Sequence, residues 1–230
     1  METSLHRELK ERYAGPDAQV EVPLGKYRID AVVDDLLIEI QHGSLGAIRD
    51  KIRTLVANHQ VLLVKPLIHR KRLIKLNEKS GDVVDRRYSP KRGSMFDLFD
   101  DLVYFRNVFP HKNLTMEIVL VEIEEWRYPG HGRRRRHREN DFVVEDQQLT
   151  KICETLRLQT RADLWAMMPK RLPRPFHTGH LAKGLGVERW VAQKIAYCLR
   201  ETGTAKQVGK EGNALLYQPA FRKKRKKSAA

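Results

Sequence analysis

Cysteine is scarce in this sequence, and long apolar runs are missing. The 230 residues include two cysteines, Cys153 and Cys198, and no Cys-x-x-Cys pair. This argues against a disulfide scaffold and against a cysteine-ligated zinc site. No apolar run approaches the roughly 20 residues needed to cross a bilayer. Residues 1–6 contain no basic segment followed by an apolar one, so we expect neither a membrane span nor a signal peptide.

Acidic residues are outnumbered by basic ones. There are 44 lysines and arginines against 29 aspartates and glutamates, for a formal net charge of +15. Such a surplus favours a polyanionic partner, most simply nucleic acid. We expect DNA, with RNA as the alternative, and an intracellular location that is cytoplasmic or, in a bacterium, nucleoid-associated. A generally basic soluble protein is the plainer interpretation, because part of the charge lies in two local runs.

Two short apolar segments joined by an acidic turn are the most informative part of the chain. Tyr27–Val33 and Leu36–Ile40 read as strands that pair across Asp34-Asp35. Side chains alternate along a strand, which predicts Ile29, Ala31 and Val33 on one face and places Glu39 and Gln41 together. Pairing brings Asp30 near Glu39. Two carboxylates close together repel unless a cation offsets their charge, and Mg²⁺ is held by one or two carboxylates with waters and phosphate oxygens.

Arg-Ile-Asp30 followed by Ile-Glu39-Ile-Gln41 resembles the core of the PD-(D/E)XK nuclease superfamily. The resemblance implies that Asp30, Glu39 and the Ile40 carbonyl bind Mg²⁺ or Mn²⁺. It also implies that residue 41 assists the attacking water, although the lysine typical of that position is Gln41 here. The first helix often supplies another acid in this family, which points to Glu8.

The order of the predicted elements agrees with this core. Helical and strand patterns predict an α/β fold, a restriction-endonuclease-like mixed sheet of about five strands flanked by helices. The expected helices are 4–14, 45–57 and 94–108, and the expected strands are 19–22, 27–33, 36–40, 60–64 and 114–123. The crossover helix before residue 60 predicts that strands 36–40 and 60–64 are parallel. Glu11 and Glu21 compete with Glu8 for the acidic role, and all three have a plain interpretation as solvated charges.

The second half of the chain reads differently. Predicted helices over 146–166, 176–187 and 188–202, followed by a hairpin over 204–217, resemble a small α+β winged helix. We therefore predict a nuclease-like domain over 1–128, a basic linker over 129–145, a winged-helix-like domain over 146–220 and a basic tail over 221–230. His177 and His180 are spaced like metal ligands, but we expect a capping or exposed role for them.

The expected nucleic-acid contacts come from the linker, the second helix of the winged-helix pair and the tail. In a DNA-binding winged helix that second helix enters the major groove, although many winged helices bind proteins instead. The predicted contact residues are Arg133, Arg134, Arg135, Arg136, Arg189, Gln193, Lys194, Lys223 and Lys224.

Two functions follow from these patterns. The first is a metal-dependent DNA endonuclease with Asp30, Glu39, Gln41 and Glu8 as catalytic residues. A dimer would suit an enzyme that cuts two strands. The second is a DNA-binding protein or regulator built on a nuclease-like scaffold, in which Gln41 reflects the loss of activity. An RNA-binding regulator is a weaker third interpretation.

Overall fold

A seven-stranded mixed sheet is the centre of the molecule. The computed structural model describes residues 2–130 and 141–221. The strands of the large sheet are β1 (Gln19–Leu24), β2 (Tyr27–Val33), β3 (Leu36–Ile40), β4 (Gln60–Leu76), β5 (Val83–Tyr88), β6 (Leu114–Pro129) and β7 (Phe142–Leu158). The helices in this part of the chain are α1 (Ser4–Ala14), α2 (Leu45–Leu55), the 3₁₀ turn η1 (Met95–Asp97) and α3 (Leu98–Phe105).

Local sequence accounts for the helix boundaries. Thr3 caps α1 by accepting from the His6 N–H, and Gly15 ends this helix with a φ of 69°, a backbone conformation that glycine adopts at little cost. Ser44 caps α2 by accepting from the Gly46 N–H. The predicted range for α1 is confirmed, and α2 ends two residues earlier than expected.

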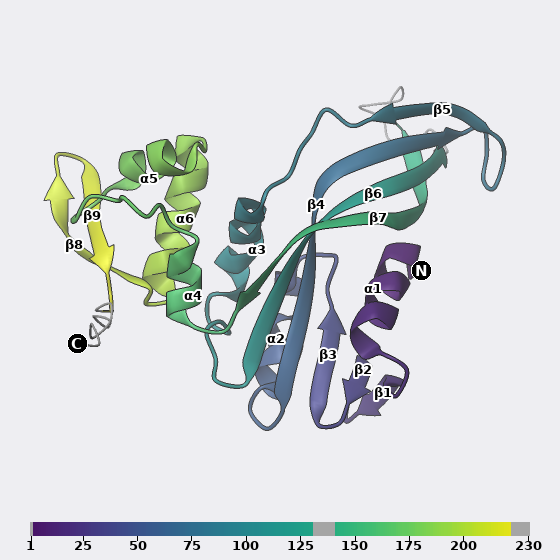
Figure 1. Cartoon of the computed structure of the whole chain (residues 1–230), viewed down its shortest axis with the longest axis horizontal. Helices are drawn as coiled ribbons and strands as arrows, with labels where there is room; N and C mark the ends of the chain where they lie inside the picture. The colour runs from purple at the N-terminus through teal and green to yellow at the C-terminus, as the bar shows by residue number, and fades with distance from the viewer. Residues whose placement is uncertain (1, 131–140, 222–230) are drawn as a thin grey trace, which may run out of the picture.

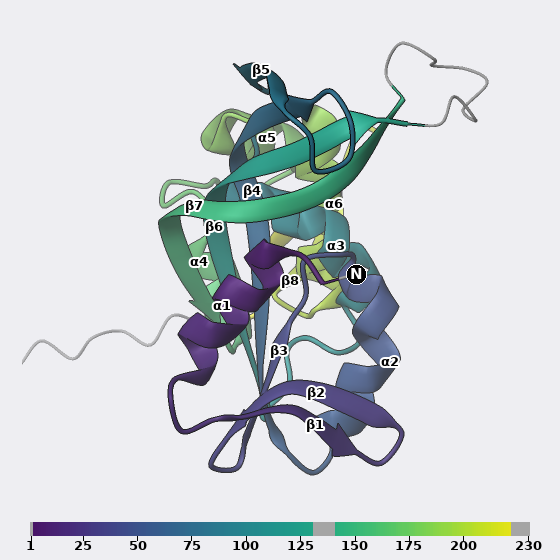
Figure 2. The same ribbon diagram turned by 90° about the vertical axis from the view of Figure 1, so that its right-hand side faces the viewer.

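The sheet has the strand order β1-β2-β3-β4-β6-β7, and β5 pairs with β4. β1, β2 and β3 are antiparallel neighbours, β3 and β6 both run parallel to β4, and β7 is antiparallel to β6. Helix α1 covers one face, while α2 and α3 cover the other (Figures 1 and 2). The predicted mixed α/β architecture, with a large sheet flanked by helices, is confirmed, as is the parallel pairing of β3 with β4.

The largest differences from the prediction concern β4, β6 and β7. β4 and β6 continue well beyond the expected residues 64 and 123, and both enter the far end of the sheet. The helix expected from Asp146 is wrong, because residues 142–158 form β7 and pair with β6 along its length. This segment is therefore part of the large sheet.

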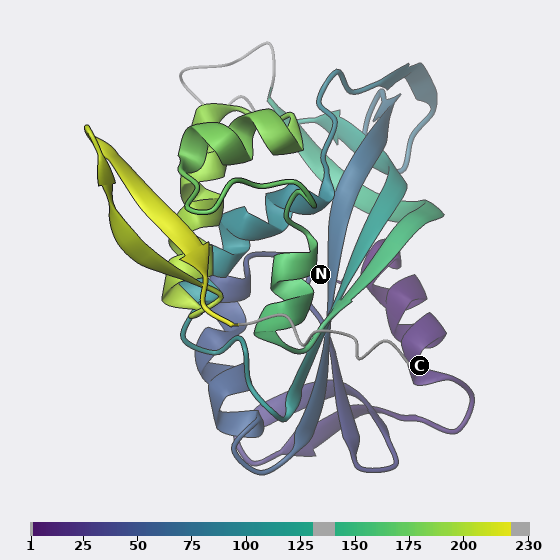
Figure 3. The same ribbon diagram turned by 60° about the vertical axis from the view of Figure 1, so that its left-hand side comes forward.

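The C-terminal elements pack beside the sheet on the α3 side (Figure 3). They are α4 (Arg161–Ala166), α5 (Thr178–Leu185), α6 (Arg189–Glu201) and the hairpin of β8 (Ala205–Glu211) and β9 (Ala214–Pro219). The buried Cys198 on α6 lies 3.8 Å from the carbonyl oxygen of Phe99 on α3. The two parts thus share one hydrophobic core. None of the described helices is long and apolar enough to span a membrane.

Candidate functional site

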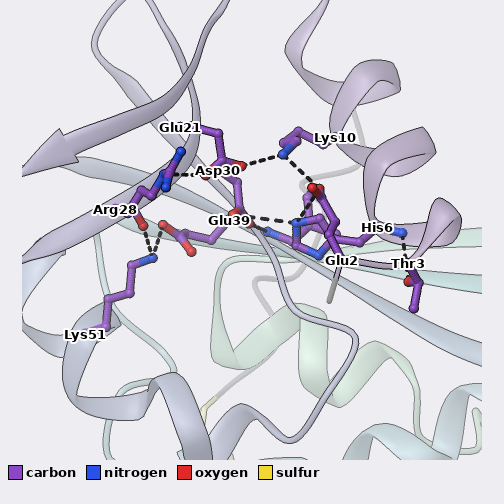
Figure 4. Close-up of polar contacts among 10 residues, drawn as sticks. Glu2, Thr3, His6, Lys10, Glu21, Arg28, Asp30, Glu39 and Lys51 are labelled. Carbon is purple, nitrogen blue, oxygen red and sulfur yellow. Dashed lines mark hydrogen bonds and ion pairs between the residues drawn. The ribbon is translucent and has the colours of Figure 1, made fainter.

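Asp30 and Glu39 lie where two paired strands separate. The β2–β3 ladder runs through the pairs Val33–Leu36, Val32–Leu37 and Ala31–Ile38. Asp30 and Glu39 are next in register, but their backbones are not paired. Instead, the Ile40 N–H donates to Asp30 Oδ2 at 2.7 Å. The turn therefore brings both carboxylates together at an open end of the hairpin, as the sequence predicted (Figure 4).

The alternation of side chains along β2 changes at Asp30. Ile29 packs in the core under α2, whereas Ala31 and Val33 pack in the core under α1. The prediction that these three residues share one face is therefore wrong. The neighbouring strand is also irregular, because Glu21 has a φ of 56°. Asp30 lies at the change of phase.

Glu39 is a buried carboxylate beside one cation. Its side chain is 5% exposed, and Lys51 Nζ of α2 lies 2.6 Å from Glu39 Oε1. Burial raises the pKa of Glu39 to about 7, with a further increase from the Asp30 charge and an opposing effect from Lys51. The site thus holds a buried carboxylate whose ionised form is supported mainly by one lysine.

Asp30 is in a more favourable environment for a charge. Burial tends to raise the pKa of Asp30, but the effect is outweighed by His6, the Ile40 N–H and Lys51, so the pKa lies below its ordinary value. His6 Nε2 of α1 is 3.6 Å from Asp30 Oδ1. The pKa of His6 is raised, mainly by its interaction with Asp30.

A second set of charges surrounds the pair on its α1 side. Lys10 Nζ lies 2.8 Å from Glu2 Oε1 and 2.5 Å from Glu21 Oε1, and Arg28 Nε is 2.6 Å from Glu21 Oε2 (Figure 4). Sequence reasoning missed His6. The signal for it was the i, i+4 spacing of His6 and Lys10, which puts both on one side of α1.

Glu8 does not join this site. It lies beside the backbone of Leu149 on β7 and near Asp146, and burial raises its pKa. Each residue of an α-helix is turned by about 100° from the one before it, so Glu8 points roughly opposite to His6. The expectation that Glu8 completes the carboxylate pair is wrong. Of its competitors, Glu21 lies close to the site and Glu11 is exposed on α1.

Gln41 is turned toward the start of α2. Its amide Nε2 donates to the Ser44 carbonyl oxygen at 3.0 Å. The ammonium next to Glu39 comes from Lys51 instead. Lys51 Nζ also donates to the Arg28 carbonyl oxygen at 2.5 Å, which fixes its position. Nothing in the spacing of the sequence distinguished Lys51 from the other basic residues of α2.

A buried lysine holds the loop that connects this site to α2. Lys65 Nζ donates to the carbonyl oxygens of His42 at 3.0 Å and Gly43 at 2.6 Å, and it lies 3.0 Å from Asp101 Oδ2. Asp101 Oδ1 accepts from the Leu45 N–H at 3.0 Å. Asp101 thus ties α3 to the first turn of α2, and this anchoring orients the helix that carries Lys51.

The predicted nucleic-acid contacts have different surroundings. Arg133, Arg134, Arg135, Arg136, Lys223 and Lys224 lie outside the described residues. Arg189 and Gln193 are exposed near the start of α6. Lys194 forms an ion pair with Asp100 of α3, and its ammonium lies 4.4 Å from the Trp190 ring centroid. Lys194 is therefore engaged within the protein.

His177 and His180 have the capping role that the sequence predicted. His177 Nδ1 accepts from the Gly179 N–H at 3.0 Å, and the His177 N–H donates to His180 Nδ1 at 3.3 Å. The two residues complete a capping box at the start of α5. Their rings stack with centroids 3.7 Å apart.

Within residues 2–130 and 141–221, no group of three or more His, Cys, Asp or Glu side chains is arranged to hold a metal ion. A divalent ion at this site would therefore have two carboxylates from the chain, Asp30 and Glu39. Two carboxylates are enough for Mg²⁺, which keeps several of its waters and binds substrate phosphates.

Comparison with known proteins places the chain in a family. An uncharacterized protein from Treponema pallidum (strain Nichols) is 29% identical over 219 residues, which cover 94% of this chain and 85% of that protein. No solved structure matches. The model of a domain of unknown function, DUF8091, matches residues 3–159, from α1 to the residue after β7. Because this match covers more than half of the sequence, the chain belongs to the DUF8091 family.

Proposed function

We propose that this protein is a divalent-metal-dependent endonuclease that hydrolyses phosphodiester bonds of DNA. The observation that carries the proposal is the pair of neighbouring carboxylates, Asp30 and the 5% exposed Glu39, whose pKa burial raises to about 7. Keeping two carboxylates close together in a buried place is costly inside a protein. Sites that retain such a cost are frequently functional.

The donor set fits a hard divalent cation. Asp30 and Glu39 supply two anionic oxygens, the Ile40 carbonyl is a third candidate ligand, and Mg²⁺ or Mn²⁺ prefers oxygen ligands. Such an ion, when bound, polarises a phosphate oxygen and lowers the pKa of a bound water. In this proposal Asp30 is already ionised at neutral pH. Glu39 has a pKa of about 7, close to the ambient pH, so binding of a divalent cation would shift it to the ionised form.

The residues around the pair have distinct proposed roles. Lys51 Nζ, 2.6 Å from Glu39, supplies the positive charge that Gln41 lacks and would orient a water or a phosphate oxygen. Gln41 supports the start of α2 through Ser44. His6, held beside Asp30, is placed to donate a proton or to hold a phosphate oxygen.

The remaining parts would hold the substrate. The proposal includes a restriction-endonuclease-like arrangement for the large sheet and a winged-helix-like role for α5, α6 and the β8–β9 hairpin. What supports the second assignment is the element order and the exposed Arg189 and Gln193 near the start of α6. A dimer would place two such sites on opposite strands.

The test is cleavage of supercoiled plasmid and of labelled single-stranded and branched DNA in Mg²⁺ or Mn²⁺. Asp30→Asn and Glu39→Gln keep the side-chain shapes but remove the charges. We expect both variants to lose cleavage while they keep DNA binding in metal-free buffer. Glu11→Gln, at an exposed position on α1, is the matched control and should cleave normally. Activity that survives both site substitutions would refute the proposal.

A non-catalytic DNA-binding protein is the second candidate, and one observation favours it. Each carboxylate already has a cationic neighbour from the chain itself, Lys51 for Glu39 and His6 for Asp30. The pair could therefore be a structural charge cluster. Calorimetric titration with Mn²⁺ separates the two candidates, because the second predicts no binding that depends on Asp30 and Glu39.

A further inference from the structure

β5 is the most exposed element of the large sheet. All six of its residues are exposed, and it pairs with the far half of β4, from Arg72 to Leu76. Figures 1 and 2 show this pair projecting past the helices that cover the rest of the sheet. A strand with both faces in water gains little from burial. Its side chains are therefore accessible to a partner.

One face of the β4–β5 pair gathers arginines around a tyrosine. Residues directly opposite each other in an antiparallel pair share a face, so the pairs Arg72–Tyr88 and Ile74–Arg86 define one face. Arg70 belongs to it as well, because its guanidinium carbon lies 3.6 Å from the Tyr88 ring centroid. We call Arg70, Arg72, Arg86 and Tyr88 the arginine face.

The arginine face has little countercharge. Arg72 pairs with Glu124 at 3.2 Å, whereas Arg70 and Arg86 have no ion pair within the described residues. On the opposite face, Arg87 lies 3.9 Å from Asp85.

Tyr88 and Arg70 together form a flat platform. Tyr88 is 50% exposed although the guanidinium covers one side of its ring, so the rest of the ring faces solvent. Nucleobases stack on aromatic rings and on guanidinium planes, but only when they are not already stacked within a duplex. Guanidinium groups bind phosphates through two parallel hydrogen bonds.

We propose that the arginine face binds a single-stranded segment of DNA, with a base on the Arg70–Tyr88 platform and phosphates at Arg72 and Arg86. The inference rests on the DNA-binding part of the proposed function and does not depend on cleavage. It gives the protein a contact with unpaired DNA that is separate from the carboxylate pair, and it points to substrates that contain single-stranded regions.

The experiment measures binding of a labelled single strand, and of its duplex, by fluorescence anisotropy in metal-free buffer at several salt concentrations. Arg86→Ala should weaken single-strand binding and reduce the slope of log K against log salt by about 0.7, the value for one phosphate contact. Tyr88→Ala should weaken single-strand binding about tenfold and leave duplex binding nearly unchanged. Arg87→Ala removes the same charge from the opposite face of the same strand, so it should bind within about twofold of the unmodified protein.

Three results would overturn the inference. The first is an Arg70→Ala/Arg86→Ala double variant that keeps normal single-strand affinity and a normal salt slope. The second is an equal loss of single-strand affinity in Arg86→Ala and Arg87→Ala. The third is an equal loss of single-strand and duplex affinity in Tyr88→Ala. Circular dichroism of each variant shows whether the sheet is intact. Binding is measured without metal, so it is independent of cleavage. If the protein never cleaves DNA but its single-strand binding depends on the arginine face, the proposed nuclease activity alone is refuted. If the protein cleaves DNA but its single-strand affinity does not depend on the arginine face, this inference alone is refuted.

Discussion

Replacing Glu39 by glutamine should make the protein less sensitive to pH. Burial raises the pKa of this carboxyl from 4.5 to about 7. A group whose folded-state pKa is raised binds its proton more tightly in the folded state, so the free energy of unfolding falls as pH rises from the unfolded value through the folded one. The pKa difference corresponds to about 3 kcal/mol in full, of which about 2.5 kcal/mol is lost between pH 5 and pH 8.

The measurement is urea unfolding at pH 5 and pH 8 in the presence of a chelator. The unmodified protein should lose about 2.5 kcal/mol more than Glu39→Gln over this interval, or about 5–10 °C in Tm for a chain of this size. Titration of His6 also lowers stability as pH rises through its raised pKa, but it does so in both proteins. Asp30, with a lowered pKa, loses its contribution only at lower pH. Glu11→Gln is the matched control and should follow the unmodified protein.

Parallel pH dependence of Glu39→Gln and the unmodified protein would refute the argument that Glu39 is held in a costly environment. A second outcome concerns the metal. Saturating Mg²⁺ at pH 8 should stabilise the unmodified protein by about 3 kcal/mol at a hundredfold excess over Kd and leave Glu39→Gln unchanged. If Mg²⁺ stabilises both proteins equally, the pKa of Glu39 would still be raised by burial, but Glu39 would not be a ligand of the metal.

Other side chains give independent tests. Lys51→Met removes the ammonium that lowers the pKa of Glu39, so cleavage should fall at least about tenfold and its pH–rate profile should shift to higher pH; an unchanged profile would show that Lys51 has no role in the site. Lys65→Ala leaves the Asp101 carboxylate and two carbonyl oxygens without their partner. We expect the free energy of unfolding in urea to fall by about 3–5 kcal/mol. A decrease below about 1 kcal/mol would mean that the loop is held by other contacts. His177→Ala removes the cap of α5 and should cost about 1 kcal/mol, with full stability as the contrary result.

β7 shows why local pattern can mislead. Leu149 and Ile152 are three residues apart, as on one side of a helix, and both pack against the core under α1. In the strand this spacing arises because the pairing with β6 shifts, so that Ile123 faces Leu149, Glu122 faces Lys151 and Val121 faces Ile152. Each such bulge adds a residue and interrupts the alternation of a regular strand. The sequence alone does not show where those shifts fall.

The sequence by itself determined the features that depend on neighbouring residues. The cap of α2, the turn at Asp34-Asp35 and the register that sets Asp30 near Glu39 follow from side-chain chemistry and from the two-residue period of a strand. For α1 the sequence predicts Ser4 as the cap, whereas the structure has Thr3 in this role. These are short-range effects, and the predicted elements in this part of the chain match the structure closely.

Only the tertiary structure decided which side chains surround the carboxylates. Lys51 and His6 come from helices on opposite faces of the sheet, and Glu8 is excluded by the rotation of α1. Lys194 likewise pairs with Asp100, which is distant in sequence. Burial and charge pairing are set by the packing of several elements at once, so the state of Glu39 depends on the three-dimensional surroundings that the fold provides.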